Sequence, residues 1–304
     1  MATRLGYCCI NIGLREQGIT TNRTMIRKTF KSRGVAYASE LALQNCQDLR
    51  SILSWNAELG IQLFRITSDL FPWASEYELT DLPDYDAIVI NLRDAGDIAV
   101  MSNQRLSFHP GPFNVLASPR PDVVDKAIAD LTHHGTVFDL MGMPRSPEAK
   151  INIHVGGAYG DREAAMIRFC EGVKRLPATA RSRLTVENDD RASLYSVQDL
   201  FDGVYCHVGI PIVFDYHHHQ FRPGTLTEEQ ALRLAASTWP DGITPCCHYT
   251  ESKELEQGGT KPTPAHSDYV EGPIHDYGLD LDIMLEAKAK ELALFRYNEG
   301  AHHI

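Results

Sequence analysis

The feature that most limits how this sequence can fold is a unit that recurs along the whole chain, a short apolar run followed by a longer amphipathic stretch. Strands buried on both faces of a parallel sheet look like this, because Val, Ile, Leu and Phe fill them almost without interruption. We therefore predict eight strands, at residues 5–12, 61–67, 105–109, 150–155, 183–187, 211–215, 244–248 and 282–286.

The amphipathic stretches between these runs are typical of helices that cover a sheet. We predict helices at residues 39–59, 86–100, 122–140, 162–176, 197–204, 228–238 and 287–297. Thr227, followed three residues later by Gln230, has the spacing of a helix-capping box.

Strand and helix alternating eight times predict an α/β protein that folds as a single-domain (β/α)8 barrel, the TIM barrel. The domain comprises residues 1–304, with a short tail from about residue 298. A doubly wound open sheet is the alternative, but it does not explain the strand-end residues described below.

The formal net charge of −11 by itself argues against a nucleic-acid ligand, because phosphate binding normally needs a basic surface. Two observations weaken that objection. Several carboxylates are candidate metal ligands, and each divalent cation would offset their charge. Basic residues also gather in residues 23–33, which contain five Lys or Arg and no acid.

Cysteine usage and hydropathy indicate an intracellular protein. The seven cysteines form no C-x-x-C motif, so we expect them to be small buried side chains in a reducing compartment. No apolar run reaches the roughly 18 residues that a membrane span needs. The first residues lack a charged segment followed by a cleavable apolar stretch, so we expect a cytoplasmic location and no membrane partner.

Each predicted strand ends in, or is soon followed by, a polar residue. In a barrel these carboxyl-terminal ends converge on one face, where the active sites of such enzymes lie. One histidine at a strand end is usually a hydrogen-bonded core residue, but four histidines and three carboxylates together are hard to explain that way. The residues are Asn11, Asp69, His109, His154, Glu187, Asp215 with His218, His248 and Glu286.

Imidazole and carboxylate ligands in one cavity suit Zn2+, Mn2+ or Fe, and no thiolate is needed. His266 lies in a loop and could add another imidazole. Because so many ligands exceed the demand of one ion, we predict two or three metals, with Glu187 or Asp215 bridging. Clusters of this kind hydrolyse phosphodiesters.

Several motifs in this order along the chain carry a family resemblance. They are Leu5-Gly6-Tyr7, Thr20-Thr21-Asn22-Arg23-Thr24, Phe64-Arg65-Ile66, His109-Pro110-Gly111, residues 154–160, residues 184–189, Asp215-Tyr216-His217-His218 and Glu286-Ala287-Lys288. The sequence resembles the UV damage endonuclease family, which is related to the abasic-site nucleases of the endonuclease IV group. The resemblance extends from near the first residue to about residue 291.

The resemblance implies a barrel with up to three divalent metals, most commonly Mn2+, with Zn2+ or Mg2+ as alternatives. It implies metal-assisted nicking of double-stranded DNA on the 5′ side of cyclobutane dimers, (6-4) photoproducts and some abasic sites, leaving a 3′-hydroxyl and a 5′-phosphate. Glu187, Asp215, His248 and Glu286 would surround a central ion, His109 and His154 a second shared with Glu187, and His218 and His266 a third. The catalytic set would be His109, His154, Glu187, Asp215, His248 and Glu286.

The resemblance also implies DNA contacts, with three departures from the family pattern. Tyr7, Asn11, Asn22 and Arg23 would lie along the DNA groove. Pro112-Phe113 stands where some members have the Gln-Tyr pair that enters the duplex, and Phe113 can still wedge there. Cys246 replaces a lysine two residues before the strand-seven histidine. Asp69 stands where a histidine can occur, so its role as a ligand is open.

Other functions compatible with a metal-bearing barrel remain open from the residues alone. An abasic-site endonuclease of the endonuclease IV type is one. A metal-dependent sugar isomerase or epimerase is another, although such sites tend to contain more carboxylates. A non-catalytic damage-binding protein is a third, and the apparently complete ligand set argues against it. None of these functions requires an organic cofactor.

Overall fold

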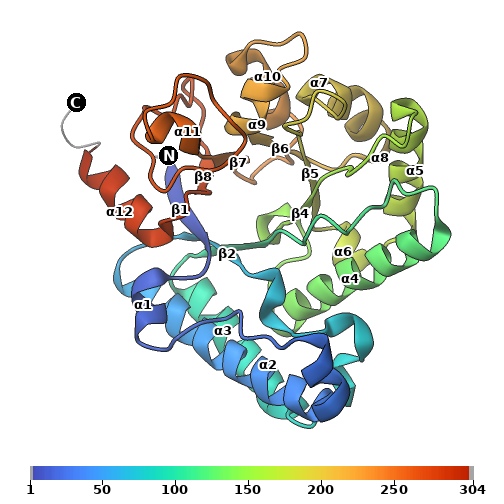
Figure 1. Cartoon of the computed structure of the whole chain (residues 1–304), viewed down its shortest axis with the longest axis vertical. Coiled ribbons are helices and arrows are strands. Elements are labelled where there is room, and N and C mark those ends of the chain that lie inside the picture. Colours follow the sequence, from blue (N-terminus) through green and yellow to red (C-terminus); the bar gives the residue numbers. More distant parts are fainter. Residues whose placement is uncertain (1–2, 301–304) are drawn as a thin grey trace.

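The structure is a computed structural model, and it describes residues 3–300. Its centre is a closed barrel in which each strand pairs in parallel with the next, and β1 pairs with β8 to close the ring (Figure 1). The strands are β1 (Arg4–Cys9), β2 (Leu63–Ile66), β3 (Arg105–Phe108), β4 (Ile151–Ile153), β5 (Leu184–Glu187), β6 (Ile212–Asp215), β7 (Cys246–Tyr249) and β8 (Asp282–Leu285).

Helices surround the strands, as Figure 1 shows for the paired α2 and α3 and for α4 and α5. The α-helices are α1 (Ile12–Glu16), α2 (Arg27–Glu58), α3 (Tyr85–Met101), α4 (Pro121–Leu140), α5 (Arg162–Arg175), α6 (Ala178–Arg181), α7 (Val197–Leu200), α8 (Cys206–Val208), α9 (Tyr216–Phe221), α10 (Glu228–Ala236), α11 (Lys253–Glu256) and α12 (Lys290–Gly300). Short 3-10 turns are η1 (Ser68–Leu70), η2 (Ala74–Glu76), η3 (Leu79–Asp81) and η4 (Pro147–Ala149), and η5 (Phe201–Tyr205) is a π-helical turn.

All eight predicted strands are present, and the barrel fold is confirmed. The strands are a few residues shorter than the apolar runs, because the runs continue into the connecting loops. Helix α2 begins earlier than predicted, at Arg27, and contains a break at Gly34, whose φ of 65° is a left-handed conformation that favours glycine. The predicted capping box of Thr227 and Gln230 begins α10.

The two ends of the barrel differ in how they are closed. At the amino-terminal end, the first residues of three strands form ion pairs, a buried one between Asp282 Oδ2 and Arg105 Nη1 at 2.7 Å and a partly buried one between Asp282 Oδ1 and Arg4 Nε at 2.6 Å. At the carboxyl-terminal end the strands lead into loops that carry the predicted site residues. The expected tail begins inside α12, which continues to Gly300, and residues 301–304 lie outside the described part of the chain.

None of the helices within residues 3–300 has the combined length and apolar character required to cross a membrane.

Candidate metal centre

Glu187 is the centre of the cluster at the carboxyl-terminal end of the barrel. It is the last residue of β5 and is 1% exposed. Its Oε2 lies 3.0 Å from His109 Nε2 and 3.0 Å from His248 Nδ1, and its Oε1 lies 3.2 Å from His218 Nδ1 and 3.8 Å from His154 Nε2. One buried carboxylate therefore faces four imidazoles that come from four different segments of the chain.

The strands next to Glu187 add two more carboxylates. Asp215 ends β6, is fully buried and accepts a 2.7 Å hydrogen bond from the backbone N–H of His218. This bond caps α9 and fixes where His218 projects. Glu286, directly after β8, lies with Oε1 3.2 Å from His248 Nδ1 and Oε2 3.7 Å from His266 Nδ1. The structure thus brings together all eight residues expected to bind metal.

Two groups within this cluster are tight enough to hold an ion. The ligand atoms of His109, His154 and Glu187 all lie within 4.8 Å of one another, and so do those of Glu187, Asp215 and His248. Both groups contain Glu187, one of the two carboxylates predicted to bridge, and the second group also contains Asp215. Among residues 3–300, His218 and His266 belong to no third group of this tightness.

The chemistry of the donors fits bound cations. Four buried polar atoms of the cluster make no hydrogen bond within the described chain, namely His154 Nδ1, Glu187 Oε1, Asp215 Oδ2 and His248 Nδ1. Buried polar atoms are almost always hydrogen-bonded, so a concentration of exceptions needs a reason. Nitrogen and carboxylate ligand atoms that no hydrogen bond satisfies are what Zn2+ or Mn2+ would take up.

The pKa values of the cluster also indicate a place for positive charge among its carboxylates. Burial acts to raise the pKa of Glu187, but the imidazoles of His248 and His154 outweigh it and hold that pKa well below its usual value. Burial raises the pKa of Asp215 to about 8. Burial lowers the pKa of His154 and His218, but neighbouring carboxylates outweigh it and raise these values to about 9 and about 11. The carboxylates around His154 and His218 therefore favour positive charge on these imidazoles.

Four further residues of the centre had been given no role from the sequence. Arg65 on β2 pairs with Glu286, Asn152 on β4 donates a hydrogen bond to Glu187 Oε2, and Asp189 Oδ1 lies 3.2 Å from His154 Nδ1. The fourth is Lys150, whose Nζ lies 3.1 Å from His248 Nε2. Lys150 and Asn152 stand four and two residues before His154, so strand alternation could have placed all three on one face.

Two residues expected to lie along a DNA groove are buried instead. Tyr7 is fully buried, and its hydroxyl donates to Asn56 Oδ1 at 2.8 Å. Asn11 is 1% exposed, caps α1 through the backbone N–H of Leu14 and donates to the Tyr7 hydroxyl at 3.1 Å. Neither side chain has a surface on which DNA could lie. Their polar groups serve the start of α1.

The other residues expected to contact DNA differ in how far they are exposed and in whether they are already bonded within the chain. Asn22 is half-buried and accepts a 2.6 Å hydrogen bond from the Thr20 hydroxyl. Arg23 is engaged within the chain, because its Nη1 lies 2.6 Å from Asp48 Oδ2 and its Nη2 donates to the Gly18 carbonyl. Pro112 and Phe113 are exposed, Phe113 at 88%. The two residues that replace the Gln-Tyr pair are therefore the ones that reach solvent.

Two other expectations, on Asp69 and on the cysteines, are corrected by the structure. Asp69 does not join the site, because the chain turns into η1 directly after β2 and leaves Asp69 exposed. His217 and His219, on either side of His218, are buried at 3% and 5% exposed. His134 on α4 is buried against Phe108, with ring centroids 5.0 Å apart. Of the seven cysteines, Cys206 is exposed rather than buried.

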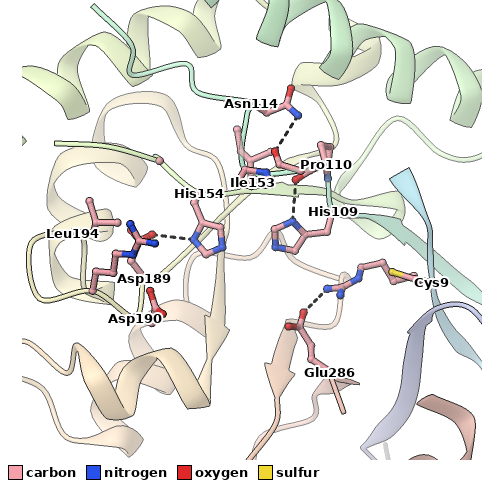
Figure 2. A pocket seen from close by; sticks show the side chains of 15 residues that line it. Cys9, His109, Pro110, Asn114, Ile153, His154, Asp189, Asp190, Leu194 and Glu286 are labelled. Carbon is pink, nitrogen blue, oxygen red and sulfur yellow. Dashed lines mark hydrogen bonds and ion pairs between the residues drawn. The ribbon is translucent and has the colours of Figure 1, made fainter. Parts of the chain in front are cut away.

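A cavity of about 430 Å³ opens beside the cluster. Figure 2 shows His109 and His154 directed into the same space, with Glu286 paired to its arginine below them. Pro110–Pro112 and Asn114 form one side of the cavity and Asp189–Arg191 another. The exposed Phe113 follows directly in sequence at this rim.

The fold and the cluster define a class of protein, a (β/α)8-barrel enzyme with a buried histidine–carboxylate centre at the end of the barrel where catalysis occurs. Comparison with known proteins identifies the family. The chain matches the family UV-endonuclease UvdE over residues 3–302, and it belongs to that family. The solved structure of SacUVDE is 31% identical, covers 98% of this chain and 97% of its own, and superposes with a TM-score of 0.83.

Two relatives with similar sequences are described as endonucleases of the same kind. The UV-damage endonuclease of Schizosaccharomyces pombe is 36% identical over 96% of this chain, and the UV DNA damage endonuclease of Bacillus cereus (strain G9842) is 32% identical over 97%. The chain spans 49% of the length of the first relative and 93% of the second. The expected family and its class of DNA-cleaving enzyme are thus confirmed.

The barrel itself is shared more widely. A D-psicose 3-epimerase from Clostridium cellulolyticum H10 superposes with a TM-score of 0.53 at 16% identity, covering 78% of this chain. At that identity the likeness shows the fold alone.

Proposed function

We propose that this chain is a metal-dependent endonuclease that cuts the DNA backbone on the 5′ side of cyclobutane dimers and (6-4) photoproducts. The products would carry a 3′-hydroxyl and a 5′-phosphate. The observation that carries the proposal is the arrangement around Glu187, where four imidazoles share one buried carboxylate beside a cavity, in a chain of the UvdE family. An enzyme with this substrate works on DNA inside the cell, and we treat residues 1–304 as one barrel domain.

Two or three divalent cations, most commonly Mn2+ in this family, would be held by the eight clustered residues. Glu187, Asp215, His248 and Glu286 would hold the central one, and His109 and His154 a second together with Glu187. His218 and His266 are the candidates for a third. When bound, such cations activate water and offset the charge that develops on a phosphate during hydrolysis.

The residues of the chain have separate tasks around these ligands. Asn152 donates a hydrogen bond to Glu187 and so fixes the orientation of the bridging carboxylate. Arg65 does the same for Glu286, and its buried guanidinium also adds positive charge beneath the cavity. Asp189 Oδ1 lies 3.2 Å from His154 Nδ1, and its charge favours the ring orientation in which Nε2 is directed toward Glu187.

The rim of the cavity has the groups needed to hold a distorted duplex. Arg191 is exposed, lines the cavity and makes no side-chain hydrogen bond or ion pair within residues 3–300, so its guanidinium is available for a phosphate. Phe113 presents an exposed ring that can enter the duplex where bases leave the stack. Rotating out a photoproduct costs less than rotating out an intact pair, because damaged bases stack poorly.

The proposal is tested with three otherwise identical labelled duplexes, which carry one cyclobutane dimer, one abasic site or no lesion. With Mn2+ we expect a single cut directly 5′ of the dimer, and a DNA polymerase should extend the product because it ends in a 3′-hydroxyl. Chelator should abolish the cut, and Mn2+ added in excess should restore it.

Each other outcome separates this proposal from its rivals. Cleavage of the abasic duplex alone would indicate an enzyme of the endonuclease IV type. Binding of the dimer duplex without cleavage at any Mn2+ concentration would indicate a damage-binding protein. No DNA cleavage together with turnover in a panel of ketoses would indicate an epimerase.

A further inference from the structure

The start of α2 carries three positive charges that the proposed chemistry does not use. Arg27, Lys28 and Lys31 are exposed there, and among residues 3–300 their side chains form no hydrogen bond or ion pair. Lys31 follows Lys28 by three residues and Arg27 by four, so all three side chains share one side of the helix. A different side carries Phe30, which stacks on Trp73 with ring centroids 5.5 Å apart. One side of this segment is thus held by the protein, and the other presents unpaired cations to solvent.

The helix itself disfavours positive charge at this place. The first turn of α2 contains no acidic residue, and its N-cap, Ile26, makes no side-chain hydrogen bond to the free N–H groups. The amino-terminal end of a helix is the positive end of its dipole, so cations in the first turn destabilise it and anions stabilise it. The three cations therefore make folding less favourable, and an anionic ligand would reverse their effect.

The start of α2 extends beyond the helices around the barrel on the side of the candidate metal centre. Ser39 Oγ accepts a 2.9 Å hydrogen bond from the backbone N–H of Asp84, the N-cap of α3. Helices of such a barrel begin at the carboxyl-terminal ends of the strands, where the active site lies. The part of α2 that precedes Ser39 continues past this level for about three turns.

The loop after β2 connects this segment with the metal centre. Near its beginning, Ser68 donates a 2.8 Å hydrogen bond to the carbonyl of His109, a candidate ligand. Further along, Trp73 Nε1 donates a 2.9 Å hydrogen bond to the carbonyl of Met25, directly before the N-cap of α2. One loop thus bonds to both places, so the fold fixes where the three cations stand relative to the ligands.

We propose that the side of α2 formed by Arg27, Lys28 and Lys31 binds the phosphate backbone of duplex DNA outside the lesion. This proposal rests on the proposed function, which makes DNA the substrate. A chain with a net charge of −11 repels DNA over much of its surface, so attraction must come from local groups of cations. Phosphate contacts position a duplex but carry no information about its bases. The contact should therefore strengthen binding of damaged and intact duplexes equally.

The first test is the double variant Arg27→Gln with Lys31→Gln, compared with Lys174→Gln with Arg181→Gln. The control removes the same two charges from exposed positions at the ends of α5 and α6, just before β5. Binding of undamaged duplex in Mn2+ is titrated at several salt concentrations. We expect the slope of log affinity against log salt to become shallower by about two units in the first variant and to stay unchanged in the control.

Nicking of the dimer duplex gives a second readout. In the Arg27 and Lys31 variant, KM should rise by the same factor as the Kd for undamaged duplex, with the loss in KM rather than in kcat. An unchanged salt slope, or equal changes in the variant and the control, would overturn the proposal. Wild-type protein that binds duplex with the expected slopes but cuts none would refute the proposed function alone.

A charge-retaining variant separates the role of charge from that of shape. Arg27→Lys with Lys31→Arg should keep the wild-type salt slope, because both cations remain. The urea midpoint of the Gln variant should stay the same or rise, because cations leave the positive end of a helix. A charge-retaining variant that binds as weakly as the Gln variant would contradict a backbone contact by these charges.

Discussion

The two ends of the barrel both bury charges, but they balance them differently. At the amino-terminal end, Asp282 is fully buried and is neutralised by Arg4 and Arg105, while Arg105 also donates to the carbonyls of Pro147 and Thr244. At the carboxyl-terminal end, Glu187 and Asp215 are equally buried and each has an oxygen without a hydrogen bond.

This difference separates structural charges from functional ones. The chain supplies its own arginine cations at one end, whereas at the other it gathers carboxylates and imidazoles that fit the proposed metal ions. Buried charges that lack a partner are costly, and they are retained where they bind or react. The same division is general in barrels of this kind, which are stabilised at one end and catalyse at the other.

The strongest test of this difference between the two ends is to remove the charge of Glu187. Glu187→Gln keeps the shape of the side chain but removes the charge that four imidazoles surround. We expect nicking of the dimer duplex to fall about 1,000-fold or more, which corresponds to ~4 kcal/mol. Glu58→Gln, the same change at an exposed position on α2, serves as the control and should leave nicking unaltered. Full activity in Glu187→Gln would remove it from the mechanism.

The amino-terminal end should respond in stability rather than activity. Asp282→Asn leaves Arg105 buried without its counter-charge, so we expect the free energy of unfolding to fall by about 3 kcal/mol. The loss in urea unfolding should be the same in Mn2+ and in chelator. Asp122→Asn breaks an exposed pair with Arg120 and should cause no measurable change. A loss at Asp282 that depended on Mn2+ would mean that the two ends are not separate.

The sequence predicts some features of the two barrel ends and not others, according to whether a feature depends on local pattern or on the alignment of strands. The strands and the eight clustered ligands are predictable, because buried parallel strands are continuous apolar runs and their carboxyl-terminal ends must converge. The contacts of Lys150 and Asn152 are not, because they depend on the stagger between strands that closes a barrel. Arg65 lies in a motif that the sequence marks, but only the closure of the ring, in which β1 pairs with both β2 and β8, gives it Glu286 as a partner.

The loops explain the incorrect expectations. Tyr7 and Asn11 were expected along the DNA groove because of the family resemblance, but both are buried, and their polar groups form hydrogen bonds with Asn56, with each other and with the start of α1. Asp69 was expected near the site because it follows β2, but the turn at η1 directs it outward. Such outcomes depend on how a loop returns over the barrel, which a local pattern does not specify.

Proton competition should also distinguish the two ends. His154 and His218 have pKa values of about 9 and about 11, above the ordinary 6.5, so at pH 7 each holds a proton that a cation must displace. Apparent Mn2+ affinity should rise between pH 6 and 9 by about tenfold per pH unit for each displaced proton, or ~1.4 kcal/mol. Calorimetry in buffers of different ionisation enthalpy should detect proton release.

The same raised pKa values determine how the stability of the folded state changes with pH. In chelator, these imidazoles stabilise the folded state fully below about pH 6.5, and the contribution of His154 is lost as the pH rises through about 9. The pairs of Asp282 should show no change in that range, because guanidinium stays charged. Mn2+ binding without proton release would contradict the raised pKa values of His154 and His218.

The smallest expected effect lies at the rim, where the comparison can be made with two matched exposed side chains. Phe113 is 88% exposed beside the cavity, and Met101 is 85% exposed at the end of α3, near the amino-terminal end of the barrel. Phe113→Ala should weaken binding to the dimer duplex by about 1 kcal/mol, because one aromatic contact with unstacked bases is lost. Binding to undamaged duplex should change less, since an intact stack offers the ring no entry.

Met101→Ala is the matched control and should alter neither affinity in fluorescence titrations at fixed salt. An equal loss on both duplexes would make Phe113 a general contact, and lesion selection would then depend on the cavity behind it.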